Sequence, residues 1–237
     1  MRMLHTSLAA LLAFPLLAAI QEPVKVEGGL ITGTPGWGWG VREYLGVPFA
    51  APPVGSLRWA PPQPPAPWSG THDATHPAKM CAQGTVANED CLYLNITVPR
   101  GPGKRSPKPV MVWVHGGGLS VGAGSTYDPR RMATEGDVIV VTIDFRLNVF
   151  GFFAYEGLAG SGTFGFQDQQ AALRWVERNI AAFGGDPHNV TLFGESGGGV
   201  GTCAQLTSPA AVGLFDKVIM QSGGCSTSWP RNGAYLG

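Results

Sequence analysis

A serine flanked by glycines is the residue pattern in this chain best suited to chemistry. Residues Gly194–Gly198 read Gly-Glu-Ser-Gly-Gly and follow the short apolar run 191–193. A strand that turns sharply into a helix strains its middle residue, and glycines two positions before and after it remove side chains that would collide. The pattern therefore predicts a reactive serine, Ser196, exposed where a strand ends. A flexible Gly/Ser loop is the alternative for these five residues taken alone.

A second glycine run could serve the same chemistry. His115 and Gly116–Gly118 directly follow the apolar run 110–114. Glycines let backbone N–H groups turn toward a ligand with no side chain in the way, as an oxyanion hole requires. We therefore expect Gly117 and Gly118 to donate hydrogen bonds to an oxyanion together with Gly197, and His115 to support the loop. An ordinary turn is the alternative.

Both motifs lie in a part of the chain where strands and helices alternate. Buried strands are predicted at 110–114, 138–143, 190–193 and 217–221, and helices at 128–135 and 167–183. This alternation is typical of an α/β fold with a parallel sheet, whose ligands bind outside the carboxyl ends of the strands. The two glycine motifs are therefore expected side by side.

The N-terminal half has a different pattern. Short alternating runs broken by glycines from 24 to 46 predict antiparallel strands at a sheet edge, and 92–98 reads as a further strand.

Composition limits the classes of partner. The chain has 237 residues, 44% hydrophobic and 14% charged, and a net charge of zero. These values suit one large domain with a substantial core. They lack the basic excess of a nucleic-acid-binding protein, so no nucleic-acid partner is expected. A small, neutral or apolar molecule is the expected ligand, and the sequence indicates no oligomeric state.

Residues 1–19 have the proportions of a secretory signal peptide. Arg2 and His5 precede an apolar run, residues 8–20, that is too short to span a bilayer. We therefore expect a secreted or periplasmic protein without a stable membrane anchor, whose folded part begins near residue 23. A buried N-terminal helix is the alternative.

Export would permit disulfide bonds. The four cysteines allow three sets of pairings. The local pairs are Cys81 with Cys91 and Cys203 with Cys225.

Longer stretches carry a family resemblance. From about Pro23 to Cys225 the chain resembles the type-B carboxylesterases, the cholinesterase-like branch of the α/β-hydrolases. The matching stretches are LGVPFAAPPVGSLRW at 45–59, EDCLYLNI at 89–96, VMVWVHGGG at 110–118, VVTIDFRLNVFGF at 140–152 and DQQAALRWVERNIAAFGGDPHNVTLFGESGGG at 168–199.

The resemblance implies an α/β-hydrolase fold, with a mostly parallel central sheet and an antiparallel N-terminal edge. It implies hydrolysis of small carboxylic esters by a Ser-Glu/Asp-His triad, with no metal and no organic cofactor. Ser196 would be the nucleophile, and the oxyanion donors would be Gly117, Gly118 and Gly197. Glu195 and Ser222 match positions near the catalytic histidine of the family, and Cys81 and Cys91 match its disulfide.

The resemblance fails at the triad. In α/β-hydrolases the acid and the histidine follow the serine, yet the 41 residues after Ser196 contain one acid, Asp216, and no histidine. We therefore expect residues 23–237 to be the N-terminal part of an esterase domain, incomplete at the C-terminus and poorly active alone. The alternatives are a non-catalytic, cholinesterase-like binding module and an inactive truncated fragment.

Overall fold

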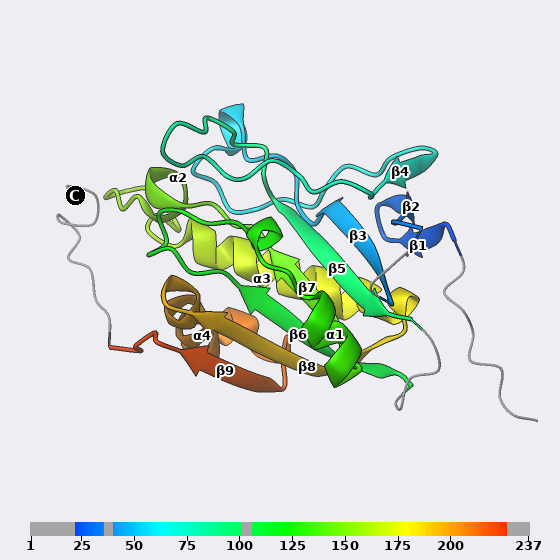
Figure 1. Ribbon diagram of the computed structural model, residues 1–237. Helices are drawn as coiled ribbons and strands as arrows, with labels where there is room; N and C mark the ends of the chain where they lie inside the picture. The colour runs from blue at the N-terminus through cyan, green and yellow to red at the C-terminus, as the bar shows by residue number, and fades with distance from the viewer. Residues whose placement is uncertain (1–21, 36–39, 101–105, 227–237) are drawn as a thin grey trace, which may run out of the picture.

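The computed structural model describes residues 22–35, 40–100 and 106–226 (Figure 1). The expected signal peptide, residues 1–19, lies outside the described residues.

A six-stranded sheet forms the centre of the molecule, in the order β3-β5-β7-β6-β8-β9 (Figure 1). The strands are β3 (Val41–Pro48), β5 (Tyr93–Pro99), β7 (Ile139–Ile143), β6 (Lys108–Val114), β8 (Gly185–Glu195) and β9 (Lys217–Gln221). The pairs β3/β5 and β5/β7 are antiparallel, whereas β7/β6, β6/β8 and β8/β9 are parallel. The predicted α/β-hydrolase sheet, with an antiparallel N-terminal edge, is confirmed.

Helices cover both faces of this sheet. Helix α1 lies on one face, and α3 and α4 lie on the other (Figure 1). The α-helices are α1 (Arg130–Gly136), α2 (Asn148–Phe152), α3 (Phe164–Asn179) and α4 (Gly197–Thr207), and the 3-10 turns are η1 (Gly55–Leu57), η2 (Gly124–Thr126), η3 (Ile180–Phe183) and η4 (Pro209–Ala211).

Helix α3 forms because its apolar residues recur every four positions. Ala172, Val176 and, in η3, Ile180 are fully buried on one face. The helical segment ends at Gly184, which takes the left-handed conformation (φ 80°) that glycine adopts without steric cost.

Two expectations about strands were wrong in part. The strands at the N-terminus do not all join the central sheet: β1 (Val24–Val26) and β2 (Gly29–Thr32) form a separate sheet with β4 (Thr71–Asp73). Alternation of apolar residues predicts a strand but not its partner, and β4 comes from a distant segment. Strand β9 is present but not buried, because it is the edge strand of the described sheet and four of its five residues are exposed.

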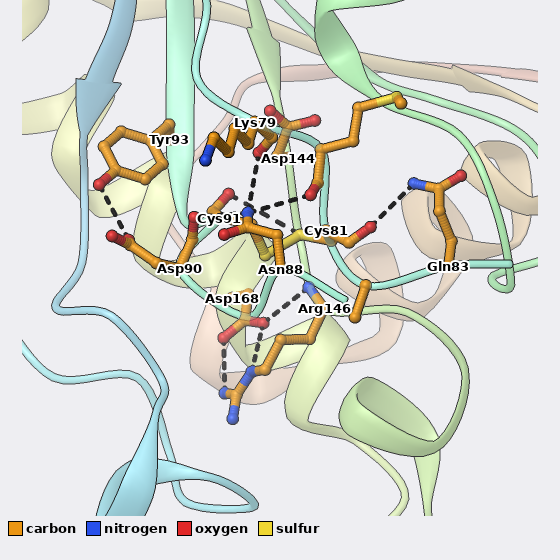
Figure 2. Close-up of a disulfide and its surroundings, with 12 residues drawn as sticks. Lys79, Cys81, Gln83, Asn88, Asp90, Cys91, Tyr93, Asp144, Arg146 and Asp168 are labelled. Carbon is orange, nitrogen blue, oxygen red and sulfur yellow. Dashed lines mark hydrogen bonds and ion pairs between the residues drawn. A yellow bond between two sulfur atoms is a disulfide. The ribbon is translucent and has the colours of Figure 1, made fainter. Parts of the chain in front are cut away.

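A buried ion pair joins α3 to the segment after β7. Arg146 donates from Nε and Nη2 to the two carboxylate oxygens of Asp168 at 2.8 and 2.7 Å, as Figure 2 shows. The backbone N–H of Arg146 also donates to this carboxylate, at 3.0 Å, and its Nη1 donates to the carbonyl oxygen of Ala60 at 2.9 Å. Both side chains are almost fully excluded from solvent. The contacts thus tie three segments together.

Two disulfides are present, Cys81–Cys91 and Cys203–Cys225, so both local pairs suggested by the sequence occur. Among the described helices, none is long and apolar enough to cross a membrane.

Candidate active site

Ser196 lies at the sharp turn between β8 and α4. Strand β8 ends at Glu195, helix α4 begins at Gly197, and Ser196 between them has φ 54° and ψ −119°. Few residues with a side chain adopt this backbone conformation, so the turn is strained. Ser196 is partly exposed. Its N–H donates to the carbonyl oxygen of Gln221 at 2.8 Å, which fixes the turn against β9.

The glycines around Ser196 allow two backbones to approach closely. A Cβ atom on Gly194 would lie 2.5 Å from the carbonyl oxygen of Gly198, and one on Gly198 would lie 2.0 Å from that of Val114. Both distances are shorter than real Cβ contacts, so glycine is required at both positions. The steric argument that gave the elbow from sequence therefore applies, and it extends to contact with β6.

The second glycine motif lies beside the elbow because β6 and β8 are neighbours. In their parallel register Val114 pairs with Gly194, so the residues that follow each strand emerge together. We call residues 115–124 the glycine loop. A Cβ atom on Gly197 would lie 2.9 Å from the backbone nitrogen of Gly118. The structure thus brings the loop and the start of α4 into contact.

The backbone N–H groups of this region are available to a ligand. Gly117 and Gly118 are exposed, and neither N–H donates a hydrogen bond to any of the described residues. Gly197 is the first residue of α4, and the first N–H groups of a helix have no acceptor within it. These groups are suited to stabilise a negatively charged oxygen.

His115 supports the loop from inside. Its ring is 1% exposed, stacks on Phe145 with ring centroids 4.5 Å apart, and hydrogen-bonds through Nδ1 to the carbonyl oxygen of Gly116 at 2.8 Å. Nε2 is buried and has no partner among the described residues. Burial lowers the pKa of His115 to about 4, although the bond to Gly116 opposes this shift. The imidazole is therefore neutral near pH 7.

Two further side chains, those of Gln83 and Asp144, and the backbone N–H of Asn148 hold the glycine loop, and the sequence motifs identified none of these contacts. The amide of Gln83 bonds both backbone groups of Gly122, at 2.8 Å each. Asp144 accepts from the N–H of Gly124 at 2.8 Å. The backbone N–H of Asn148 donates to the carbonyl oxygen of Leu119 at 2.8 Å, and its side chain donates to that of Ala82 at 2.8 Å.

Asp144 is buried, and its carboxylate has no cationic partner among the described residues. Burial raises its pKa to about 7, and the N–H of Gly124 opposes that shift. The only signal in the sequence was its place, directly after the apolar run of β7.

The other residues expected near the site lie on the β8 and β9 side of Ser196. The Glu195 side chain reaches toward the glycine loop, because a Cβ atom on Gly116 would lie 3.0 Å from its Oε2. Ser222 is exposed and has φ 53°. The adjacent Gly223 packs on the elbow: its Cβ would lie 2.6 Å from the carbonyl oxygen of Ser196. Disulfide Cys203–Cys225 ties this segment to α4.

The described residues contain no cluster of three or more His, Cys, Asp or Glu side chains that could hold a metal ion. A cavity of about 290 Å³ lies away from Ser196, between η2, α1 and strands β3, β5 and β7. It is lined by Glu43, Leu45, Pro77, Asn95, Thr142 and residues 124–130.

Known proteins share this sequence and this fold. The profile of the carboxylesterase family matches residues 21–234. The chain is 49% identical over 201 residues to the pyrethroid hydrolase Ces2e of Rattus norvegicus, covering 78% of this chain and 35% of that protein. It is 46% identical over 215 residues to the cocaine esterase of Oryctolagus cuniculus, covering 84% of this chain and 40% of that protein.

A solved structure agrees with the sequence matches. The carboxylesterase EST55 of Geobacillus stearothermophilus superimposes with a TM-score of 0.80 at 44% identity, covering 86% of this chain and 43% of that one. The chain thus spans between 35% and 43% of the length of these three proteins. The family profile covers most of the chain, and the structure has both a central sheet with an antiparallel edge and a sharp strand-to-helix turn at Ser196. The chain belongs to the carboxylesterase family.

Proposed function

We propose that this chain carries the nucleophile and the oxyanion hole of a serine esterase that hydrolyses small, neutral carboxylic esters. The observation that carries the proposal is the strained φ of Ser196 at the start of α4, next to unused N–H groups of the glycine loop. Backbone strain of this kind persists only where the surrounding structure enforces it, and strained residues cluster at active sites. The names of the relatives, pyrethroid hydrolase and cocaine esterase, also favour ester substrates.

The proposed reaction has two steps. Ser196 Oγ attacks the ester carbonyl carbon and gives up its proton to a base, and the N–H groups of Gly117, Gly118 and Gly197 hold the resulting oxyanion. The bond to the leaving alcohol breaks, the alcohol takes up a proton, and an acyl-serine remains. Water then attacks this ester and releases the carboxylic acid and the free serine.

We propose that none of the described histidines is the base. The Nδ1 of His115 is bonded to Gly116 and its Nε2 is buried. His72 bonds the carbonyl oxygen of Gly46, His76 bonds Thr75, and His188 lies near the start of β8, whereas Ser196 follows its end. On this proposal residues 1–237 alone turn over slowly, because removing the base of a comparable serine hydrolase lowers kcat about 10⁶-fold.

The test exploits this slowness. Purified chain, shown to be folded by circular dichroism, is incubated with para-nitrophenyl acetate beside a Ser196→Ala variant. Because nitrophenolate leaves without a proton from a general acid, whereas deacylation needs a base to activate water, we expect the acetyl group to stay on Ser196 once it has formed and to be found by peptide mass spectrometry. Added imidazole should speed release of nitrophenol in the wild type more than in the variant. Equal labelling of both proteins would refute the assignment of Ser196.

We also propose that the protein is exported with residues 1–19 removed. The two disulfides support an oxidising compartment. Sequencing the N-terminus of the mature protein tests this, and an intact Met1 in secreted material would contradict it.

A further inference from the structure

Gln83 links the ring closed by Cys81–Cys91 to the glycine loop. Its Oε1 accepts from the N–H of Gly122 at 2.8 Å, and its Nε2 donates to the carbonyl oxygen of the same residue at 2.8 Å. Nε2 also donates to the carbonyl oxygen of Cys81 at 3.1 Å, a bond drawn in Figure 2. One amide thus pairs with both backbone groups of Gly122, as a neighbouring β-strand would.

We propose that Gln83 is a positioning residue for the oxyanion hole: it fixes the glycine loop and does not touch the substrate. This inference rests on the proposed function of the loop.

Gly122 is the residue at which the end of the glycine loop packs against its start, at His115 and Gly116. It has φ 112°, and a Cβ there would lie 2.5 Å from Nδ1 of His115 and 2.6 Å from the carbonyl oxygen of Gly116. The intervening turn is closed by the N–H groups of Ser120 and Val121, which donate to the carbonyl oxygen of Gly117. Holding Gly122 therefore holds the turn on which the two exposed donor N–H groups lie.

The Gln83 side chain is itself held by a small rigid ring. Its backbone forms a bridge with Val86, with N–H to oxygen distances of 3.0 and 2.8 Å. The Asn88 amide donates to the carbonyl oxygens of Met80 and Asp90, at 3.1 and 2.8 Å, across the two ends of the ring (Figure 2). Because the disulfide closes this ring, the backbone of Gln83 is held in place, and so its side chain can hold Gly122.

At neutral pH an amide satisfies both ends of this contact, whereas a carboxylate does not. A carboxylate can accept from the N–H of Gly122 but cannot donate to the carbonyl oxygens of Gly122 and Cys81. A protonated carboxyl group can do both, with one donor fewer. In a Gln83→Glu variant the glycine loop should therefore be held poorly above the pKa of the new carboxyl group and held again below it. A loss of packing alone would show no such dependence on pH.

The experiment compares Gln83→Glu, the near-isosteric Gln83→Met, and Gln63→Met as a matched control. Gln63 is exposed, and its amide bonds only the carbonyl oxygen of Pro61 among the described residues. Hydrogen exchange of the peptide that contains Gly122 is followed by mass spectrometry, and acylation of Ser196 by para-nitrophenyl acetate is followed on the same samples.

For both Gln83 variants at pH 7 we expect exchange at Gly122 to be faster by about fivefold, the factor for one net hydrogen bond. Acylation of Ser196 should slow through its rate constant rather than through the ester concentration needed for half-saturation. Gln63→Met should match the wild type. At pH 4, near the ordinary pKa of a glutamate, the exchange ratio of Gln83→Glu to wild type should fall toward one, while that of Gln83→Met should not.

Unchanged exchange at Gly122 would overturn the proposal, and so would faster exchange without slower acylation. If the wild type were never acylated at Ser196, the proposed esterase function would fail. Exchange would then still decide whether Gln83 fixes the loop.

Discussion

On the glycine-loop side of Ser196, strand β6 alternates fully buried valines with half-buried residues, and Gln83, Asp144 and Asn148 bond the loop that follows it. On the other side, β9 has four exposed residues of five, and its segment is held by pairing with β8 and by Cys203–Cys225. The same site is thus fixed by burial and side-chain hydrogen bonds on one side, and by backbone pairing and a covalent bond on the other. Mutations should affect the two sides very differently.

The largest difference is expected from truncating one apolar side chain on each side. Phe145 is fully buried against His115, whereas Ile219 in β9 is 44% exposed. Phe145→Ala should lower the free energy of unfolding by about 3–5 kcal/mol, because it leaves a cavity. Ile219→Ala should lower it by less than about 1 kcal/mol. Chemical denaturation measures both values, and similar losses would show that β9 is as well packed as the loop.

The next effect depends on pH and is confined to the glycine-loop side. Burial raises the pKa of Asp144 to about 7, above the ordinary value of 3.8. Its contribution to stability is therefore fully present below about pH 4 and is lost progressively as pH rises to 7. The lowered pKa of His115, about 4, has the opposite sign: its contribution is lost as pH falls from 6.5 toward 4. Between pH 4 and 6.5 the two effects offset each other in the wild type.

Asp144→Asn keeps an oxygen that can accept from Gly124 but removes the titration. The variant should lose stability on acidification from pH 6.5 to 4 by up to about 1.4 kcal/mol per pH unit relative to the wild type. Urea denaturation at several pH values measures the two curves. Parallel curves would show that Asp144 does not titrate in this range.

A third contrast uses two glycines with positive φ. Gly122, in the loop, has no room for a Cβ, whereas Gly213, just before β9, has no atom within 4 Å of that position. Gly213→Ala should cost about 1 kcal/mol for the backbone conformation alone. Gly122→Ala should cost more, because His115 or the backbone must move. Thermal unfolding compares them, and equal losses would contradict the close packing at Gly122.

The smallest effect is expected where the two sides meet. Ser196→Gly removes the side chain from a strained backbone position, so it should raise the free energy of unfolding by about 1 kcal/mol. It should also abolish acylation. A variant that is less stable than the wild type would show that Ser196 makes contacts which outweigh the strain.

The sequence was most informative where local sterics decide the structure. The apolar run 110–114 predicted β6, and the spacing of Gly194 and Gly198 around Ser196 predicted the elbow, since in both cases neighbours in sequence carry the constraint. The roles of the loop glycines remain predictions. Gln83 could not have been found in this way, because it acts on a residue 39 positions away and belongs to no periodic pattern. The pairing of β2 with β4 was missed for the same reason, because the two strands are about 40 residues apart in sequence.

The bond from the backbone N–H of Arg146 to Asp168 has a consequence for how the protein opens. That N–H is donated to a carboxylate from α3, inside a buried ion pair. Removing one charge from such a pair typically costs 3–5 kcal/mol, so the pair should separate only when α3 leaves the sheet. The segment that carries Asp144 and Asn148 should then belong to the most slowly exchanging cooperative unit of the protein. The exposed N–H groups of Gly117 and Gly118 would then be held by the part of the molecule that unfolds last.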